Sequence, residues 1–257
     1  MLQELGLTPV WRRRAGVVRA PTPAAESATV TPPALSDTIM EYVAEVASAR
    51  VSDRNARIAA LQWTDISADI VACTACALCK TRNRTVPGVG DARAEWMFIG
   101  EAPGAEEDAK GEPFVGQAGK LLDNMLAALG MHRDKQVYIA NVLKCRPPNN
   151  RTPTPQESGA CRPYLDRQIA LIRPRIIVAL GRSAATTLLN VDATIASLRG
   201  RVHRYRGVPL VVTYHPAYLL RTLPDKAKAW EDLCLARATM RALPLDDGLQ
   251  SAATASN

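Results

Sequence analysis

Four cysteines constrain the fold of this chain more than any other feature of its sequence. Cys73 and Cys76 form a CTAC motif, and Cys145 and Cys161 form a second pair much further along the chain. Thiolates that come from two distant segments are typical of a metal centre that ties a chain together. Four thiolates suit either a tetrahedral zinc ion or a 4Fe-4S cluster, and sequence spacing does not distinguish these two groups.

The other two cysteines and the N-terminus bear on the same interpretation. Cys79 is a rival ligand, because CTACALC contains two overlapping CxxC pairs, whereas Cys234 is expected to be a small buried group of a late helix. The first arginines follow the short apolar run at the N-terminus, which is the reverse of a secretory signal. No stretch approaches the ~20 apolar residues of a membrane span. We therefore expect a cytoplasmic protein, in which grouped cysteines bind metals more readily than they form disulfides.

The composition changes along the chain and predicts four segments. Residues 1–20 form a basic peptide, and residues 21–36 are rich in Pro, Ala and Thr, which is typical of a flexible linker. Residues 37–243 have enough apolar content for one core, and residues 244–257 are expected to be disordered. Near the start of the large segment we expect a helix over about 37–51 and a second helix from residue 53 into the cysteines.

Short apolar runs then alternate with longer helical patterns. The runs that favour strands cover residues 96–100, 137–142, 175–180 and 209–214, and helical spacing covers 117–129, 156–172 and 183–189. Buried strands joined by crossover helices favour a parallel sheet that is covered on both faces. The expected fold is α/β, with three α/β/α layers around a central, mostly parallel four-stranded sheet.

Residues that can do chemistry follow three of these strands. The segment GEAPG comes after the first strand, Asn141 ends the second, and His215 follows the last. Ligands of such sheets bind beyond the carboxyl ends of the strands. The net charge of +7 favours a polyanionic partner such as nucleic acid, although a basic enzyme without such a partner fits the charge equally well.

Five motifs in this order resemble one family. They are CTAC, GEAPGAEEDAKGEPFVGQAG (100–119), NVLKCRPPNNRTP (141–153), the later Cys161 and HPAYLLR (215–221). Together they resemble the family 4 uracil-DNA glycosylases, which are iron–sulfur members of the uracil-DNA glycosylase superfamily. The resemblance runs from about Cys73 to Leu233. It implies a hydrolase of N-glycosyl bonds that removes uracil from DNA, with a 4Fe-4S cluster on the four paired cysteines.

The resemblance assigns uracil binding and catalysis to residues that suit these tasks. Phe114 offers a flat face for the extruded base, and the amide of Asn141 matches the edge of uracil, which cytosine does not present. A hydrogen bond from His215 to the uracil O2 would stabilise the departing anion, whether the imidazole is neutral or charged. The plainer alternatives are a core phenylalanine, a turn-capping asparagine and an ordinary loop histidine.

The assignment of roles among the nearby carboxylates stays open. Glu101 directly follows the first strand and is the best candidate for holding the attacking water. Glu107 is a second catalytic candidate, and Asp108 is its rival. The better-known branch of the superfamily has an aspartate in this motif, whereas this chain has Glu101 followed by Ala102. We expect Ala102 to line the substrate pocket with its backbone.

The run HPAYLLR resembles the loop with which the family enters DNA. Tyr218, Leu219 and Leu220 are expected to form a wedge that fills the space a flipped nucleotide leaves, while Arg221 meets a phosphate. Contact with a partner helix is the alternative for exposed leucines here. Residues 181–183 open a helix whose backbone N–H groups could hold another phosphate.

Two further expectations concern partners. Residues 1–20 faintly resemble the N-terminal peptide of the clamp-loader psi subunit, which docks on the replication machinery; a basic tail is the alternative. The substrate is expected to be uracil-containing DNA, single- or double-stranded, and the protein a monomer. The competing functional class is a non-catalytic iron–sulfur or zinc DNA-binding accessory. A related variant in the superfamily binds uracil-containing DNA covalently through a histidine in a basic loop. The corresponding segment here, KCRPPNNRTPTP, contains no histidine, so a covalent DNA adduct is not expected.

Overall fold

The computed structural model describes residues 37–244. The basic peptide (1–20), the linker (21–36) and the tail beyond residue 244 lie outside the described residues, so these three assignments stay predictions. The contacts within the chain separate a first unit that ends at Val46 from a second unit that begins at Ala47. The sheet, the pockets and the cysteines all belong to the second unit.

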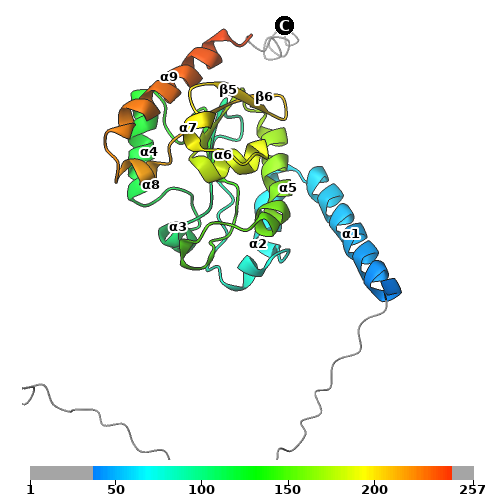
Figure 1. Cartoon of the computed structure of the whole chain (residues 1–257). Helices are drawn as coiled ribbons and strands as arrows, with labels where there is room; N and C mark the ends of the chain where they lie inside the picture. The colour runs from blue at the N-terminus through cyan, green and yellow to red at the C-terminus, as the bar shows by residue number, and fades with distance from the viewer. Residues whose placement is uncertain (1–36, 245–257) are drawn as a thin grey trace, which may run out of the picture. The chain divides into compact units, whose positions relative to one another are not determined.

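A single sheet forms the centre of the second unit (Figure 1). Its strands are β1 (Val89–Gly90), β2 (Trp96–Gly100), β3 (Val137–Asn141), β4 (Ile176–Leu180), β5 (Val202–Tyr205) and β6 (Val208–Thr213). Their order is β1-β3-β2-β4-β6-β5, and the four strands in the middle run parallel. These four are the predicted strands, so the parallel core is confirmed, but the count of four is corrected to six.

Both additional strands are antiparallel edge strands that lack a continuous apolar run. β1 has only two residues, and β5 (VHRY) has a single buried side chain. A two-residue turn joins β5 to β6, and both of its residues have positive φ, 48° at Arg206 and 84° at Gly207. This is the backbone of a tight hairpin turn. Such edge strands show no continuous apolar run, because solvent covers one of their faces.

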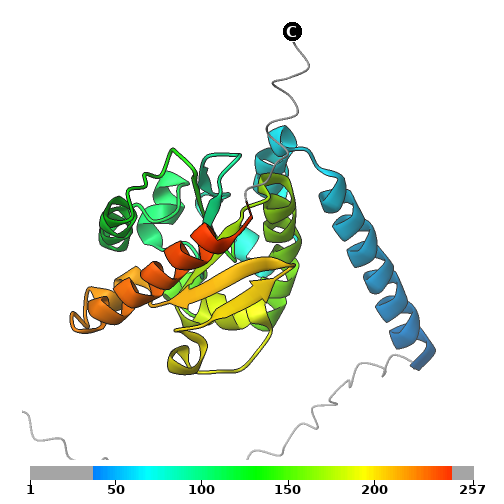
Figure 2. The same cartoon turned by 90° about the horizontal axis from the view of Figure 1, so that it is seen from above.

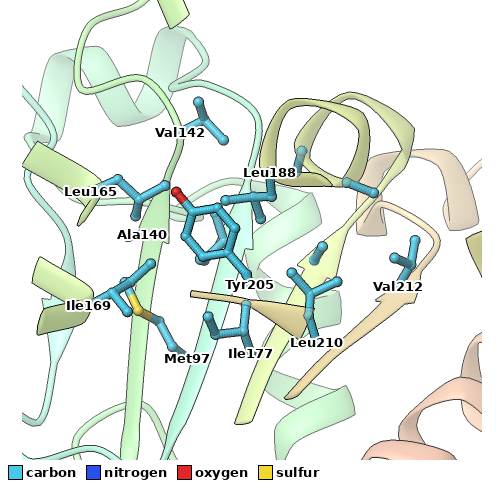
Figure 3. Close-up of a cluster of buried hydrophobic side chains, with 14 of the residues drawn as sticks. Met97, Ala140, Val142, Leu165, Ile169, Ile177, Leu188, Tyr205, Leu210 and Val212 are labelled. Atoms are coloured by element: carbon cyan, nitrogen blue, oxygen red, sulfur yellow. The ribbon is translucent and has the colours of Figure 1, made fainter. Parts of the chain in front are cut away.

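Helices cover both faces of the sheet, which confirms the three-layer fold (Figures 1 and 2). On one face lie α5 (Pro155–Ile172) and α6 (Arg182–Leu189), and on the other lie α4 (Gln117–Ala128) and α9 (Asp225–Ala242). The strand side chains alternate between two cores in agreement with their period of two. Figure 3 shows the core beneath α5 and α6, where Met97 and Ile177 of the sheet surround the ring of Tyr205.

The remaining helices are short, apart from the first. They are α1 (Asp37–Ala60), α2 (Trp63–Ala72), α3 (Ala105–Lys110), α7 (Ile195–Leu198), α8 (Pro216–Leu219) and the 3-10 turns η1 (Ala77–Lys80) and η2 (Pro148–Asn150). The predicted helix break near residue 52 is wrong, because α1 continues to Ala60 and the chain turns at Leu61 and Gln62 instead. Within residues 37–244, no helix is both long enough and apolar enough to cross a bilayer.

Candidate active site

A pocket of about 490 Å³ opens at the carboxyl ends of β2, β3 and β6. This volume lies within the usual ~300–1,000 Å³ of small-molecule sites. Seven of the eight residues that the sequence predicts for catalysis and substrate binding line the pocket: Glu101, Ala102, Glu107, Phe114, Asn141, His215 and Arg221. The parallel topology brings them together, because residues that follow neighbouring strands meet at one edge of the sheet.

Asn141 is the last residue of β3 and is only 2% exposed. Its Oδ1 is buried and accepts no hydrogen bond from the described residues. The amide approaches β2 so closely that a Cβ on Gly100 would lie 2.4 Å from Oδ1. A buried carbonyl oxygen without a partner costs about 1–3 kcal/mol. Its position in the pocket wall therefore points to an N–H donor on the ligand.

His215 caps the N-terminus of α8 and is held in one tautomer. Its Nδ1 accepts the backbone N–H of Ala217 at 3.1 Å, so the proton of the neutral ring lies on Nε2. Burial lowers the pKa of His215 to about 4, and the positive charge of Arg221 contributes to this lowering. At neutral pH the pocket therefore contains a neutral imidazole with an Nε2–H donor.

Phe114 has a left-handed backbone, with φ of 55°, and its ring lies beside His215 at a centroid distance of 5.5 Å. Gly119 makes this turn possible, because a Cβ there would lie 1.7 Å from the Phe114 oxygen. The guanidinium of Arg133 donates to the carbonyl oxygens of Pro113 at 3.0 Å and Phe114 at 2.5 Å. Phe114 is 5% exposed and packs in the core as well as lining the pocket.

The carboxylate of Glu107 accepts hydrogen bonds from three backbone N–H groups. Its Oε1 accepts from Val115 at 2.9 Å and Gly116 at 3.3 Å, and its Oε2 accepts from Gly104 at 3.1 Å. The catalytic role of Glu107 stays a prediction; in the structure its carboxylate lines the pocket and joins the start of α3 to the loop that follows Phe114. The rival Asp108 is buried and binds the backbone and side chain of Asn83, which makes it structural.

Glu101 differs from these two carboxylates. It directly follows β2 and lines both the pocket and an adjoining hollow of about 330 Å³, which Ser183 and His215 also line. No backbone N–H of residues 37–244 donates to its carboxylate. Burial raises the pKa of Glu101, and a hydrogen bond with Ser183 opposes this shift. Glu101 thus differs from Glu107 and Asp108 in that it lines the pocket without accepting a backbone N–H of residues 37–244.

The structure separates the two residues predicted to enter DNA. Arg221 lines the pocket. Leu219, in contrast, is 1% exposed and packs against Tyr214 and Ala229, so its predicted place at the substrate is wrong. The one-turn helix α8 turns its neighbour Leu220 outward, where it is 41% exposed. The four-residue length of α8 gives too little periodicity to decide between adjacent leucines from sequence.

The pocket is also lined by residues to which the sequence assigned no substrate contact, among them Pro147, Asn150 and Arg151. They come from the loop between Cys145 and Cys161, where Asn150 has a left-handed backbone. Arg151 forms two hydrogen bonds with Glu157, at 2.6 and 2.8 Å, and thereby closes this loop on α5. The Asn-Asn pair was the available signal, because asparagine is typical of such turns.

The four paired cysteines surround a second, smaller hollow, and a fifth thiol joins them. The thiols that line it are Cys73, Cys76, Cys79, Cys145 and Cys161. Cys234 lies apart on α9, half-buried. N–H groups point at three of the sulfurs: Lys144 N lies 3.2 Å from Cys161 Sγ, Arg82 Nη1 3.0 Å from Cys145 Sγ, and Arg54 Nη2 3.6 Å from Cys73 Sγ.

Within residues 37–244, no three His, Cys, Asp or Glu side chains are arranged to hold a single metal ion. Hydrogen bonds from N–H groups to the cysteine sulfurs are a feature of iron–sulfur sites. Burial raises the pKa of Cys161 to about 12. Such a thiol becomes a thiolate when a cationic group binds it.

Comparison with known proteins agrees with this geometry. The family described as the uracil DNA glycosylase superfamily matches residues 87–234. The type-4 uracil-DNA glycosylase of Archaeoglobus fulgidus is 51% identical over 164 residues, which is 61% of this chain and 82% of the relative. The same-named enzymes of Sulfurisphaera tokodaii and Thermotoga maritima are 48% and 46% identical, over 65% and 63% of this chain and 79% and 85% of the relatives. The chain therefore belongs to the uracil-DNA glycosylase superfamily and, within it, to the type-4 uracil-DNA glycosylases.

Proposed function

We propose that this protein is a monofunctional DNA glycosylase that hydrolyses the N-glycosidic bond of uracil in DNA. It leaves an abasic site and thereby begins base excision repair. The observation that carries the proposal is the buried, unpartnered Oδ1 of Asn141 in a pocket that also contains the neutral His215. A uracil ring supplies both missing partners, an N–H donor and a carbonyl acceptor.

Recognition rests on two groups along one edge of uracil, the N3–H and the O4 oxygen. The target nucleotide leaves the stack, because the base inside DNA is out of reach of a pocket of this kind. The uracil N3–H donates to Asn141 Oδ1, and the Asn141 amide nitrogen donates to uracil O4. Cytosine has no N–H at position 3 and carries an amino group at position 4, so it leaves both groups of the amide unpaired. A buried polar site rejects such an analogue strongly.

His215 and Glu101 act on opposite sides of the bond that is cleaved: His215 on the uracil and Glu101 on the sugar. The bond between C1′ and N1 breaks, and its electron pair goes to the uracil ring. The Nε2–H of His215 donates to uracil O2 and stabilises this anion. Glu101 stabilises the positive charge on the sugar and orients a water, whose oxygen bonds to C1′ while its proton passes to the carboxylate. Uracil then takes a proton from solvent.

DNA contacts follow from the exposed loop after α8. Arg221 meets a backbone phosphate, and Leu220, the exposed leucine of the predicted wedge, fills the space left by the flipped nucleotide. The exposure of Leu220 and the position of Arg221 at the pocket support this assignment. The positive charge of the whole chain supports binding to either single or double strands.

A 4Fe-4S cluster is the cofactor that the cysteines fit, with Cys73, Cys76, Cys145 and Cys161 as ligands. Such a cluster would act as a staple between the N-terminal CTAC motif and the loop that contributes Arg151 to the pocket, and would take no part in bond cleavage. Cys79 is the spare thiol of the site. Iron and sulfide analysis of the purified protein tests this, and a colourless protein with one zinc per chain would contradict it.

The proposal also covers the cellular compartment, the docking partner and the oligomeric state of the enzyme. Six free thiols fit a reducing cytoplasm. Docking of residues 1–20 on the clamp loader, and a monomeric state, are predictions that size measurement and binding of the isolated peptide would test.

Two substitutions distinguish an enzyme from a non-catalytic DNA-binding accessory, which the names of the relatives do not favour. In an enzyme, Asn141→Ala and His215→Phe should each reduce uracil release by at least ~100-fold while DNA affinity stays within about threefold. His203→Phe is the matched control, because His203 lies on β5, outside the pocket residues. Equal uracil release by all four proteins would contradict these roles, and no release by the wild type would contradict the enzyme.

A further inference from the structure

One buried cation connects the cysteine site to the uracil pocket. Lys144 is 1% exposed and lines the cysteine hollow. Its Nζ donates to the backbone oxygen of Asn141 at 2.9 Å. No carboxylate of residues 37–244 forms an ion pair with it. A buried ammonium that has only a neutral carbonyl as partner is costly, and a negative charge close to it would offset this cost.

The cysteine site would supply this negative charge once a bound cluster deprotonates its thiols. Lys144 directly precedes Cys145, and its backbone N–H points at Cys161 Sγ from 3.2 Å. When four thiolates hold a 4Fe-4S cluster, the whole site carries a net negative charge, and hydrogen bonds and charges around the sulfurs set its stability and potential. The ammonium of Lys144 is placed as the internal counter-ion of that site.

The same side chain fixes the strand end that reads uracil. Beyond β3, the backbone N–H of Val142 donates to Gly100 O at 2.9 Å, and that of Leu143 donates to Glu101 O at 3.1 Å. Lys144 then folds back onto the carbonyl of Asn141. The peptide between Asn141 and Val142 is thus held by the Gly100 oxygen at its N–H and by the Lys144 ammonium at its carbonyl.

We propose that Lys144 is a positioning residue that neutralises the cysteine ligands of the cluster and fixes the peptide of Asn141, so that cluster binding and uracil recognition are coupled. The proposal rests on the proposed function of the pocket. Lys144 is not among the residues that line the uracil pocket. Its effect therefore falls on cluster retention and on the affinity for uracil before it falls on the chemical step.

The test is Lys144→Met in the full-length holoprotein, with Lys80→Met as the matched control, because Lys80 is an exposed lysine beside Cys79. Iron and sulfide per chain, the rate of iron loss to a chelator, and the inhibition constant of free uracil are measured. We expect roughly tenfold faster iron loss and roughly tenfold weaker uracil binding for Lys144→Met, as for other groups that orient metal ligands. Lys80→Met should match the wild type.

A second variant keeps the proposal falsifiable if Lys144→Met does not fold. Lys144→Arg keeps the charge but replaces the compact ammonium, so it should retain iron like the wild type and bind uracil more weakly. Wild-type iron retention and uracil affinity in Lys144→Met would overturn the proposal, and so would iron loss without weaker uracil binding. Failure of the wild type to release uracil would instead contradict the proposed function, so the two failures are distinguishable.

Discussion

At the pocket, Asn141 and His215 are held in forms that serve a ligand better than they serve the fold. The Oδ1 of Asn141 is buried without a partner, and the imidazole of His215 is kept neutral by burial and by Arg221. Both arrangements cost free energy of folding. Binding sites commonly keep such costs, because the ligand supplies the missing interaction. Stability and activity should therefore respond in opposite directions to substitutions here.

Asn141→Ala should leave the free energy of unfolding unchanged or raise it, because it removes a buried unpaired oxygen, while uracil release falls. The expected gain is up to ~1 kcal/mol, since the cavity left by the truncation offsets part of the benefit. Urea unfolding and uracil release on the same preparation measure both effects. A loss of more than about 2 kcal/mol would show that the amide has a structural partner.

His215 predicts a pH dependence of stability. Its folded-state pKa of about 4 lies below the ~6.5 of an unfolded chain, so the unfolded chain binds more protons between these values. The contribution of neutral His215 is complete above pH 6.5 and is lost as the pH falls toward 4. His215→Phe lacks this loss, so its stability relative to wild type should rise by roughly 2 kcal/mol between pH 7.5 and pH 4.5. Urea unfolding at the two pH values would contradict this if the difference stays constant.

At the level of elements, the start of α4 is built around one close approach. Gly119 lies in the first turn of the helix, against the carbonyl of Phe114. The turn that aims Phe114 into the pocket and the helix that supports it are therefore a single unit, held also by Arg133. A side chain on Gly119 would have to move the Phe114 backbone.

Gly119→Ala should destabilise the protein by about 1–3 kcal/mol and reduce uracil release. The matched control is Gly159→Ala, a glycine inside α5 with open space around its Cβ position. That control should stabilise by ~0.5–1 kcal/mol, because alanine is the better helix residue. Thermal unfolding and uracil release of both variants decide the point. Similar behaviour of the two variants would contradict the close approach at Gly119.

The elements that the sequence predicts are those with a strong pattern. The four central strands are buried on both faces and read as continuous apolar runs, so their bounds follow within a residue or two. β1 and β5 pair only at the edges and leave no such run. The break after α1 falls at Leu61 and Gln62, which carry no helix-stopping residue. Tertiary contacts decide such positions.

The site follows from the sequence because topology places strand ends together. Asn141 and His215 could be predicted as neighbours from their positions after two strands of a parallel sheet. The burial of Leu219 could not, because it depends on packing against α9. Nor could the hydrogen bonds of Glu107 with Val115 and Gly116, because they depend on the left-handed turn at Phe114. The contact of the Lys144 ammonium with the Asn141 carbonyl could not be predicted either, because it depends on how the chain turns between residues 141 and 144.

On the scale of the whole molecule, the cysteine site joins segments that the sheet does not join. Cys73 precedes every strand, whereas Cys161 lies in α5, after β3. A cluster bound here constrains the loop between Cys145 and Cys161, from which Arg151 reaches the pocket. Integrity of the pocket should therefore depend on integrity of the cysteine site.

Cys161→Ser should lose iron and lower the thermal midpoint by roughly 10 °C, which corresponds to about 3 kcal/mol for a domain of this size. Uracil release should fall in parallel, because the loop is no longer fixed. Cys234→Ser, on α9 and outside the hollow, is the control and should keep iron, stability and activity. Metal analysis, calorimetry and uracil release give the three readouts. Full activity of an iron-free Cys161→Ser protein would contradict the structural role.

The most direct measurement is the release of free base from oligonucleotides that each contain one uracil, cytosine or thymine. Intact holoprotein is incubated with each strand, alone and in duplex, and the products are identified by mass spectrometry. The pocket geometry predicts free uracil and an uncut abasic strand from the uracil substrate, and no base from the other two. Absence of free uracil, or equal release of cytosine, would contradict the assignment of this pocket to uracil excision.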